Sequence, residues 1–246
     1  MSTLKQQQMK KQYFILPVIT GIVLLFSCNY VPGGTRLSGE IVTDQRDVPD
    51  FEGLDVSSGI DVYLSQGGEH RVTVKADKDI IDDIVTEVRN GILKIYLDRS
   101  HWRISNISVE VTFVDLNRIK ASAGSDIKSD EALKFDDLSV EASSGSDINL
   151  NLTASNLEIS ASSGSDARLN GKTTSLDIQS SSGSDIYAFD LDADNVEVNT
   201  SSGSDVRITA LKTIQVNASG GSDIYVRGNP ERQKISTSGG SDVHFR

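Results

Sequence analysis

Cysteine, proline, aromatic residues and positive charge are all scarce in this sequence of 246 residues. Cys28 is the only cysteine, which excludes an internal disulfide. With four prolines and 6% aromatic residues beside abundant Ser, Asp, Asn and Gly, the composition is typical of a thin, regular, turn-rich β-structure. The formal net charge is −11 and no basic stripe follows the first dozen residues, which argues against a nucleic-acid partner.

Signatures of catalysis are also missing. The chain has no Gly-x-Ser-x-Gly elbow, no His-Glu-x-x-His and no phosphate-binding glycine loop. His70, His101 and His244 lie far apart in unlike contexts, so no histidine accompanies the recurring serines as a base. We therefore expect no enzyme, with a polysaccharide-acting enzyme as the least favoured alternative. Outward charges are interpreted as a solvated face: Asp147, Arg168, Asp177, Arg207 and Arg227.

The N-terminus predicts export. Lysines precede the apolar run 13–26, which is too short for a comfortable membrane span, so residues 1–27 read as a signal peptide. Leu25-Phe26-Ser27-Cys28 resembles a bacterial lipobox, which makes Cys28 the expected lipidation site; a spectator cysteine is the alternative. Residues 28–40 would form a tether. We expect an exported outer-membrane lipoprotein, with its periplasmic or surface orientation left open.

The sequence does contain one motif that is repeated seven times, Gly-Ser-Asp. Gly-Ser-Asp recurs in steps of 21, 19, 19, 20, 18 and 19 residues, a period typical of a solenoid. Its glycines, with a diverged first copy at Gly59-Ile60-Asp61, are Gly59, Gly124, Gly145, Gly164, Gly183, Gly203, Gly221 and Gly240. The corresponding aspartates are Asp126, Asp147, Asp166, Asp185, Asp205, Asp223 and Asp242.

Apolar residues alternate with polar ones on both sides of each turn, as in Leu157-x-Ile159-x-Ala161 before it and Ile148-x-Leu150-x-Leu152 after it. Two strands and two turns in 19–20 residues predict an all-β fold, a parallel β-helix over 116–246. A string of antiparallel hairpins is the less favoured alternative. Residues 41–115 predict an irregular β-rich part, in which Asn90-Gly91 is a strong two-residue hairpin signal.

Stacked rungs would place the seven aspartates in one line, where like charges repel by about 1 kcal/mol per pair in water. Two readings stay open. In one, Asp and Ser side chains satisfy the backbone of the turn; in the other, less favoured, the aspartates form a calcium ladder. Tyr187 and Tyr225 share one strand position two rungs apart and could stack on a sugar, although ordinary packing between rungs is favoured.

An ordered set of motifs resembles a known family. It runs from Arg46-x-Val48 through Ser58-Gly59-Ile60-Asp61-Val62-Tyr63-Leu64 and Asn90-Gly91 into the Gly-Ser-Asp repeats. Over residues 45–246 the chain is similar to the auto-transporter adhesin head GIN domain family. The resemblance implies an exported, often lipid-anchored protein of the Bacteroides group, with a pectate-lyase-like right-handed β-helix and a role in adhesion.

From these observations we expect a non-catalytic binding or adhesion module of the cell envelope, which displays polar ladders. The alternative is a scaffold that assembles with copies of itself. Candidate partners are a membrane, through the lipid anchor, a host or glycan surface ligand, and a homo-oligomer. No cofactor is expected apart from the calcium alternative.

Overall fold

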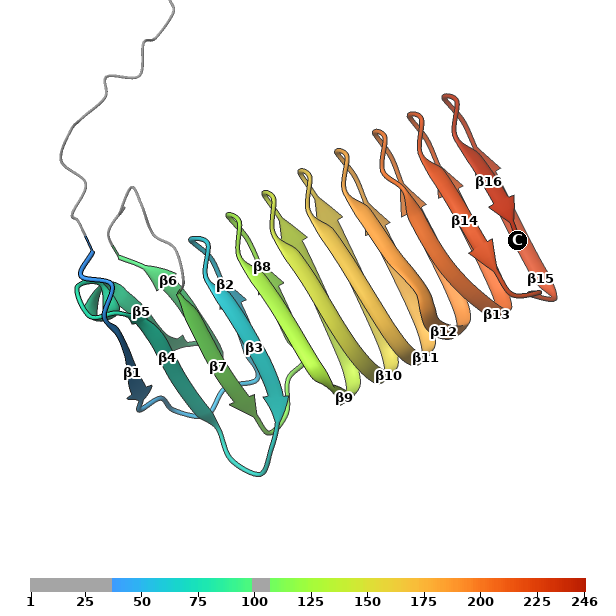
Figure 1. The fold of residues 1–246 in the computed structure, drawn as a ribbon. Coiled ribbons are helices and arrows are strands. Elements are labelled where there is room, and N and C mark those ends of the chain that lie inside the picture. Colours follow the sequence, from blue (N-terminus) through green and yellow to red (C-terminus); the bar gives the residue numbers. More distant parts are fainter. Residues whose placement is uncertain (1–36, 99–106) are drawn as a thin grey trace, which may run out of the picture. The chain divides into compact units, whose positions relative to one another are not determined.

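Alternating apolar residues on both sides of a repeated turn build a β-solenoid of about seven turns. A computed structural model describes residues 37–98 and 107–246. Cys28, the signal peptide, residues 28–36 of the tether and His101 therefore lie outside the described residues. Rungs stack side by side with their turns in register, as Figure 1 shows. No helix within the described ranges is long and apolar enough to cross a membrane.

The chain begins with an irregular part that contains both parallel and antiparallel pairs. Its strands are β1 (Ile41–Arg46), β2 (Gly53–Val56), β3 (Asp61–Gln66), β4 (Arg71–Asp77), β5 (Ile84–Arg89), β6 (Ile92–Leu97), β7 (Ser108–Phe113) and β8 (Arg118–Ala121), with a short 3-10 helix at Ile81–Asp83. The predicted hairpin is confirmed, because β5 pairs antiparallel with β6 around Asn90 and Gly91, whose φ angles are 52° and 76°.

Long strands then follow one another in parallel register. They are β9 (Asp126–Ser143), β10 (Asp147–Ser162), β11 (Asp166–Ser180), β12 (Asp185–Thr200) and β13 (Val206–Ala218), and they end in β14 (Asp223–Arg227), β15 (Arg232–Thr237) and β16 (Asp242–Phe245). Equivalent residues pair from rung to rung, so Asp147 lies opposite Asp126 and Asp166. The parallel solenoid is confirmed, and the hairpin alternative is excluded for these repeats.

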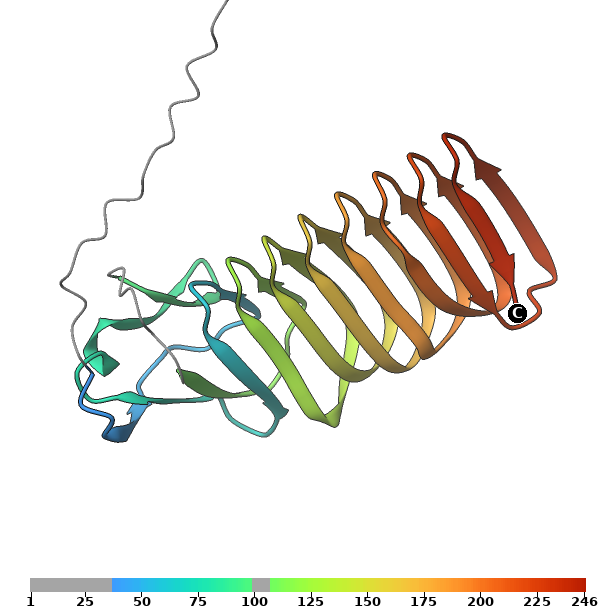
Figure 2. The same cartoon turned by 45° about the horizontal axis from the view of Figure 1, so that its top comes forward.

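One expectation about the rung is wrong. Two strands with two turns were expected, whereas β9 to β13 each run unbroken around the corner opposite the Gly-Ser-Asp turn (Figure 2). The backbone keeps pairing with its neighbour through that bend, for example from Asn151 to Ala154 of β10. Register shifts near this corner, such as that between Asn149 and Asn151, absorb the variation in repeat length.

Each rung therefore has two faces. We call the outward side of the segments that follow the turns the post-turn face; its strands are β1, β4, β7, β3, the first halves of β9–β13, β14 and β16. The outward side of the segments that precede the turns is the pre-turn face, with β5, β6, β2, β8, the second halves of β9–β13, and β15.

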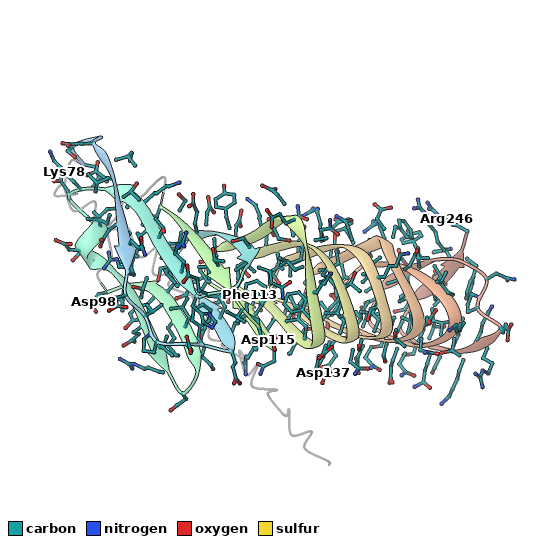
Figure 3. The ribbon with its side chains drawn as sticks, turned by 90° about the horizontal axis from the view of Figure 1, so that it is seen from below. Lys78, Asp98, Phe113, Asp115, Asp137 and Arg246 are labelled. Atoms are coloured by element: carbon teal, nitrogen blue, oxygen red, sulfur yellow. The ribbon has the colours of Figure 1, made fainter. Side chains whose placement is uncertain are left out.

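The hydrophobic core lies between these two sheets. Figure 3 shows the contrast between Phe113, which is packed inside, and Asp137, which points outward. Inward columns continue through the rungs, so each buried side chain contacts its counterparts above and below. One such column contains Ile127, Ile148, Ala167, Ile186, Val206, Ile224 and Val243.

Glycine is required in a rung for two different reasons, a positive φ angle and a close approach of the neighbouring backbone, and substitution by alanine distinguishes them. Gly171 lies at the corner opposite the turn with φ +119°, and an added Cβ would lie 1.9 Å from the carbonyl oxygen of Leu152. The turn residue Gly145 has φ +70°, with nothing within 4 Å of an added Cβ. We expect Gly145→Ala to cost about 1 kcal/mol from backbone strain alone, and Gly171→Ala about 3 kcal/mol or more because strain and a backbone clash combine.

Denaturant unfolding followed by circular dichroism measures both variants. Equal midpoints for Gly145→Ala and Gly171→Ala would contradict the close approach of the two rungs at Gly171.

Candidate functional site

The repeated turn is a type I′ turn, in which both central residues need a positive φ. In the second regular copy these are Ser144 at 56° and Gly145 at 70°. The last two copies carry Gly220 and Gly239 in place of that serine; an added Cβ at either would lie 2.9 Å from a backbone nitrogen of the preceding turn. The motif is therefore selected by backbone geometry.

The serine of Gly-Ser-Asp is the residue that closes the turn. Ser184 is fully buried, and its Oγ donates to the carbonyl oxygen of Ala161 on the preceding rung at 2.8 Å. Ser184 Oγ in turn accepts a hydrogen bond from the backbone N–H of Ser181 at 3.3 Å. Ser146 and Ser165 repeat this arrangement. Each of these serines joins its own turn to the neighbouring rung. The sequence predicted that Ser and Asp side chains would both bind the backbone of the turn, without distinguishing between them.

The seven aspartates follow one another from rung to rung along the post-turn face, and Asp61 extends their column. Their carboxylates mainly contact side chains two residues further along. Asp126 pairs with Lys128 at 2.9 Å, Asp166 with Arg168 at 3.2 Å and Asp205 with Arg207 at 3.4 Å. These three cations lie in the column two residues after the aspartates and offset part of the repulsion between the stacked carboxylates. Across the described ranges no group of three or more His, Cys, Asp or Glu is arranged to hold a metal ion.

The tyrosines of the post-turn face belong to that cation column. Tyr187 lies between the guanidinium groups of Arg168 and Arg207, at 4.5 and 4.9 Å from the ring centroid. Tyr225 contacts Arg207 at 5.4 Å and stacks on His244 at 5.0 Å. Cations and an imidazole therefore cover the ring faces that a sugar would need, so the geometry favours packing between rungs over sugar stacking.

Hollows gather on the opposite, pre-turn face. One, of about 470 Å³, extends from Ser175 and Asp177 to Lys234. A second, of about 270 Å³, extends from Asn117 to the same Asp177. A third, of about 380 Å³, lies nearer the turns, between Ser160 and Asn217. The strands of this face therefore carry a series of shallow grooves that share lining residues.

Polar side chains stand in three columns along these grooves, and the column nearest the turn contains Lys120, Glu141, Ser160, Gln179, Asn199, Asn217 and Ser236. Amides and hydroxyls bond from rung to rung: Thr213 Oγ1 donates to Asn195 Oδ1 at 2.9 Å, and Asn217 Nδ2 donates to Asn199 Oδ1 at 2.9 Å. The column nearest the corner opposite the turn contains Asp137, Asn156, Ser175, Asn195, Thr213 and Arg232. The middle column contains Arg118, Ser139, Glu158, Asp177, Glu197, Gln215 and Lys234.

The middle column places three carboxylates on adjacent rungs, because Glu158 pairs with Asp177 and Asp177 with Glu197. Asp177 Oδ1 is buried and has no hydrogen-bond partner among the described residues. Burial raises the pKa of Asp177, and the charges of Glu197 and Glu158 raise it further. By contrast, the hydrogen bond from Lys120 lowers the pKa of Glu141, a residue of the same face.

Sequence reasoning had placed Asp177 on a solvated face and did not single out the two glutamates. A signal was available: all three acids lie six residues before a turn glycine, at Gly164, Gly183 and Gly203. The histidines within the described ranges are not brought together. His70 packs on Phe51 in the irregular part, with ring centroids 4.4 Å apart, whereas His244 stacks on Tyr225 in the last rung.

Comparison with known proteins gives a consistent result. A family model described as "Putative auto-transporter adhesin, head GIN domain" matches residues 50–230. A solved "putative adhesin" of Bacteroides fragilis NCTC 9343 is similar with a TM-score of 0.83 and 21% identity, covering 87% of this chain and 100% of that one. No significant match was found among curated proteins.

Two further solved structures, both from Parabacteroides, have the same fold. A "putative lipid binding protein" of P. distasonis ATCC 8503 has a TM-score of 0.66 at 19% identity, and it covers 85% of this chain and 98% of its own. A "putative adhesin" of P. merdae ATCC 43184 has a TM-score of 0.66 at 16% identity, with the same coverage. At such identities the likeness establishes the fold alone.

The buried serine can be tested against its exposed neighbour in the same turn. Ser184→Ala removes the hydrogen bond to Ala161 and is expected to cost about 1 kcal/mol of unfolding free energy. Ser182→Ala, at an exposed position, is expected to stay within about 0.5 kcal/mol of the parent. Urea unfolding measures both; an equal loss in the two variants would show that the buried bond contributes nothing specific.

The raised pKa of Asp177 predicts a stability that falls as this group ionises. Its carboxylate opposes folding above the folded-state pKa, whereas the protonated form does not. Asp177→Asn is therefore expected to stabilise the chain at pH 7 by no more than about 1 kcal/mol, because the groove is open to water, and the gain should vanish below about pH 4. Thermal unfolding across this pH range measures it; a destabilised variant at neutral pH would contradict the repulsion.

Proposed function

Because this chain belongs to the family described as putative auto-transporter adhesin, head GIN domain, we propose that it is a non-catalytic adhesion module of the cell envelope. The ligand binds along the pre-turn face, and the stacked rungs hold that face rigid. Polar groups project from it at positions that repeat with every rung.

The observation that carries this proposal is the series of grooves on the pre-turn face. Three hollows of about 470, 380 and 270 Å³ lie on the same sheet and are lined mainly by amides, hydroxyls and charged groups. Hydroxyl-rich ligands such as glycans match these donors and acceptors. On the post-turn face, by contrast, several of the repeated charges and aromatic rings contact one another.

Export and attachment complete the proposal. A signal peptide directs the chain out of the cytoplasm, and a lipid on Cys28 anchors it to the outer membrane. The family supports export, since adhesion requires contact with the outside of the cell. The tether then separates the membrane anchor from the solenoid.

Self-assembly into a scaffold is the second proposal, and exposed core positions favour it. Ile235 and Phe245 pair with the buried Val216 and Val226, yet they are 41% and 42% exposed. A second copy that covers these side chains would extend the stack of rungs.

Matched asparagine triples test the binding face. The triple variant Asn156→Ala, Asn195→Ala, Asn217→Ala removes amides from the pre-turn face, and Asn149→Ala, Asn151→Ala, Asn170→Ala removes as many from the post-turn face and the start of the corner that follows it. On an array of neutral, acidic and amine-bearing glycans, we expect the first triple to lose about tenfold or more in binding, since each amide contributes a hydrogen bond. The second triple should bind like the parent chain.

Thermal unfolding of both triples serves as the folding control. Equal losses in the two triples, or binding to no glycan class by the parent chain, would contradict a glycan-binding pre-turn face.

A further inference from the structure

The last rung of the solenoid has a free edge on both of its sheets. Among the described residues β15 pairs only with β13 and β16 only with β14, so the outer sides of these two strands have no partner (Figure 1). Both strands belong to the same rung, on either side of the turn at Gly239 and Gly240. Two strand edges at the same level can therefore accept further strands.

On β16 the unpaired backbone groups are those of Val243 and Phe245. The backbone N–H groups of Asp242 and Arg246 donate to β14, and successive residues of a strand direct their N–H and C=O groups to opposite sides. An antiparallel copy of β16 centred on His244 would therefore exchange hydrogen bonds between Val243 of one chain and Phe245 of the other. In this register inward side chains meet inward side chains, which continues the core.

The same register matches the charges of β16 with those of its copy. It places Asp242 opposite Arg246 of the second chain, and two-fold symmetry forms this pair twice. Among the described residues neither side chain forms an ion pair within one chain: Asp242 is exposed, and the Arg246 guanidinium lies 4.8 Å from the ring centroid of Tyr225. Opposite charges directly across an antiparallel pair stabilise it. The edge of β16 is therefore complementary to itself.

On β15 the corresponding centre is Ile235. The N–H of the residue that follows this strand donates to β13, so the groups of Gln233, Ile235 and Thr237 point to the free edge. An antiparallel copy centred on Ile235 would pair this residue with itself and Gln233 with Thr237, all at inward positions. Lys234 would lie opposite Ser236, so no like charges would face each other directly.

One two-fold axis relates both strands to their copies. The turn is centred between Gly239 and Gly240, and Ile235 precedes this centre by as many residues as His244 follows it. An axis through Ile235 and His244 therefore matches the whole rung with its copy, with the turn of one chain over the opposite corner of the other. Ile235 and Phe245, which are 41% and 42% exposed in the single chain, would be covered.

We propose that two copies of this chain bind each other end to end through their last rungs, about this two-fold axis. β15 and β16 each pair antiparallel with their own copies, and the core of one solenoid continues into the other. The irregular parts, which follow the tethers, then lie at the two far ends of the pair, so that chains on facing cell surfaces can join. This inference rests on the proposed self-assembly and adds the partner, the surface and the symmetry.

The opposite end of the solenoid is less suited to receive this rung. There the post-turn sheet continues beyond β3 with β7, β4 and β1, whereas the pre-turn sheet continues beyond β2 with β6 and β5. The two sheets end at different levels, so a flush rung cannot pair with both at once. Head-to-tail stacking would also give an open series of copies, whereas pairing about a two-fold axis closes at a dimer.

A single cysteine at the two-fold axis tests the pairing. In the full chain with Cys28→Ser, which leaves no other cysteine, His244→Cys brings two thiols to a non-hydrogen-bonded antiparallel pair, where the Cα atoms lie about 4.5 Å apart and a disulfide can form. With oxidised glutathione as the oxidant, we expect a covalent dimer on a non-reducing denaturing gel. Tyr225→Cys, at the same position one rung inside, should stay monomeric because its copy lies about 14 Å away.

Exchange of the two charges of β16 locates the interface. Asp242→Arg or Arg246→Asp alone places like charges opposite each other, and either is expected to weaken dimerisation of the full chain about tenfold or more in sedimentation velocity. The double variant restores opposite charges and should restore dimerisation. Asp223→Arg changes the equivalent aspartate one rung inside and should dimerise like the parent chain. Thermal unfolding verifies that all four variants are folded.

Three results would overturn the proposal: a parent chain that stays monomeric up to about 1 mM, a His244→Cys variant that cross-links no better than Tyr225→Cys, or a double charge variant that does not regain dimerisation. Assemblies larger than a dimer would overturn the two-fold axis while the scaffold proposal stands. Glycan binding to the pre-turn face is measured separately, so that proposal survives a monomeric chain.

Discussion

Parallel, in-register pairing between successive rungs is the constraint on which every other feature depends. It places each residue beside its counterpart one repeat away, so that Ile148 packs on Ile127 and Asp166 lies next to Asp147. Inside the solenoid this stacking is favourable, because apolar side chains cover one another and exclude water. On the outside, the same stacking brings like charges together. Each outward column of charged residues therefore needs neighbouring groups that reduce the electrostatic repulsion between adjacent rungs.

The two faces meet that need differently. On the post-turn face a line of aspartates is accompanied by Lys128, Arg168 and Arg207, and Tyr187 is inserted between two of these cations. That face therefore compensates part of its own charge. On the pre-turn face amide and hydroxyl ladders stand beside charged side chains of both signs, and the surface between the columns is hollowed into shallow grooves. These grooves are the physical reason for assigning binding to the pre-turn face.

Much of this arrangement could be predicted from the sequence, because the same glycine turn and the same alternation of apolar and polar residues recur in every repeat. The alternation around each turn predicted two-sided strands, and Asn90-Gly91 predicted a hairpin that the structure confirms. The smooth corner opposite the turn was not predicted, since no local signal distinguishes a bend within a continuous strand from a second turn. The different roles of the serine and the aspartate in Gly-Ser-Asp were not predicted either. Ser184 forms a hydrogen bond to the backbone of the preceding rung, whereas Asp166 faces outward and pairs with Arg168.

The sequence by itself determined the period of the rung, the inward and outward alternation of its side chains and the presence of a glycine turn in each repeat, because each can be recognised from residues close together in the chain. Only the tertiary structure decided which charges are compensated. Glu158, Asp177 and Glu197 are separated by about a full repeat, and whether a cation lies beside them depends on the stacking of rungs and on the hollows between side-chain columns. Electrostatic balance is a property of neighbours in space, and in a solenoid most of those neighbours come from other rungs.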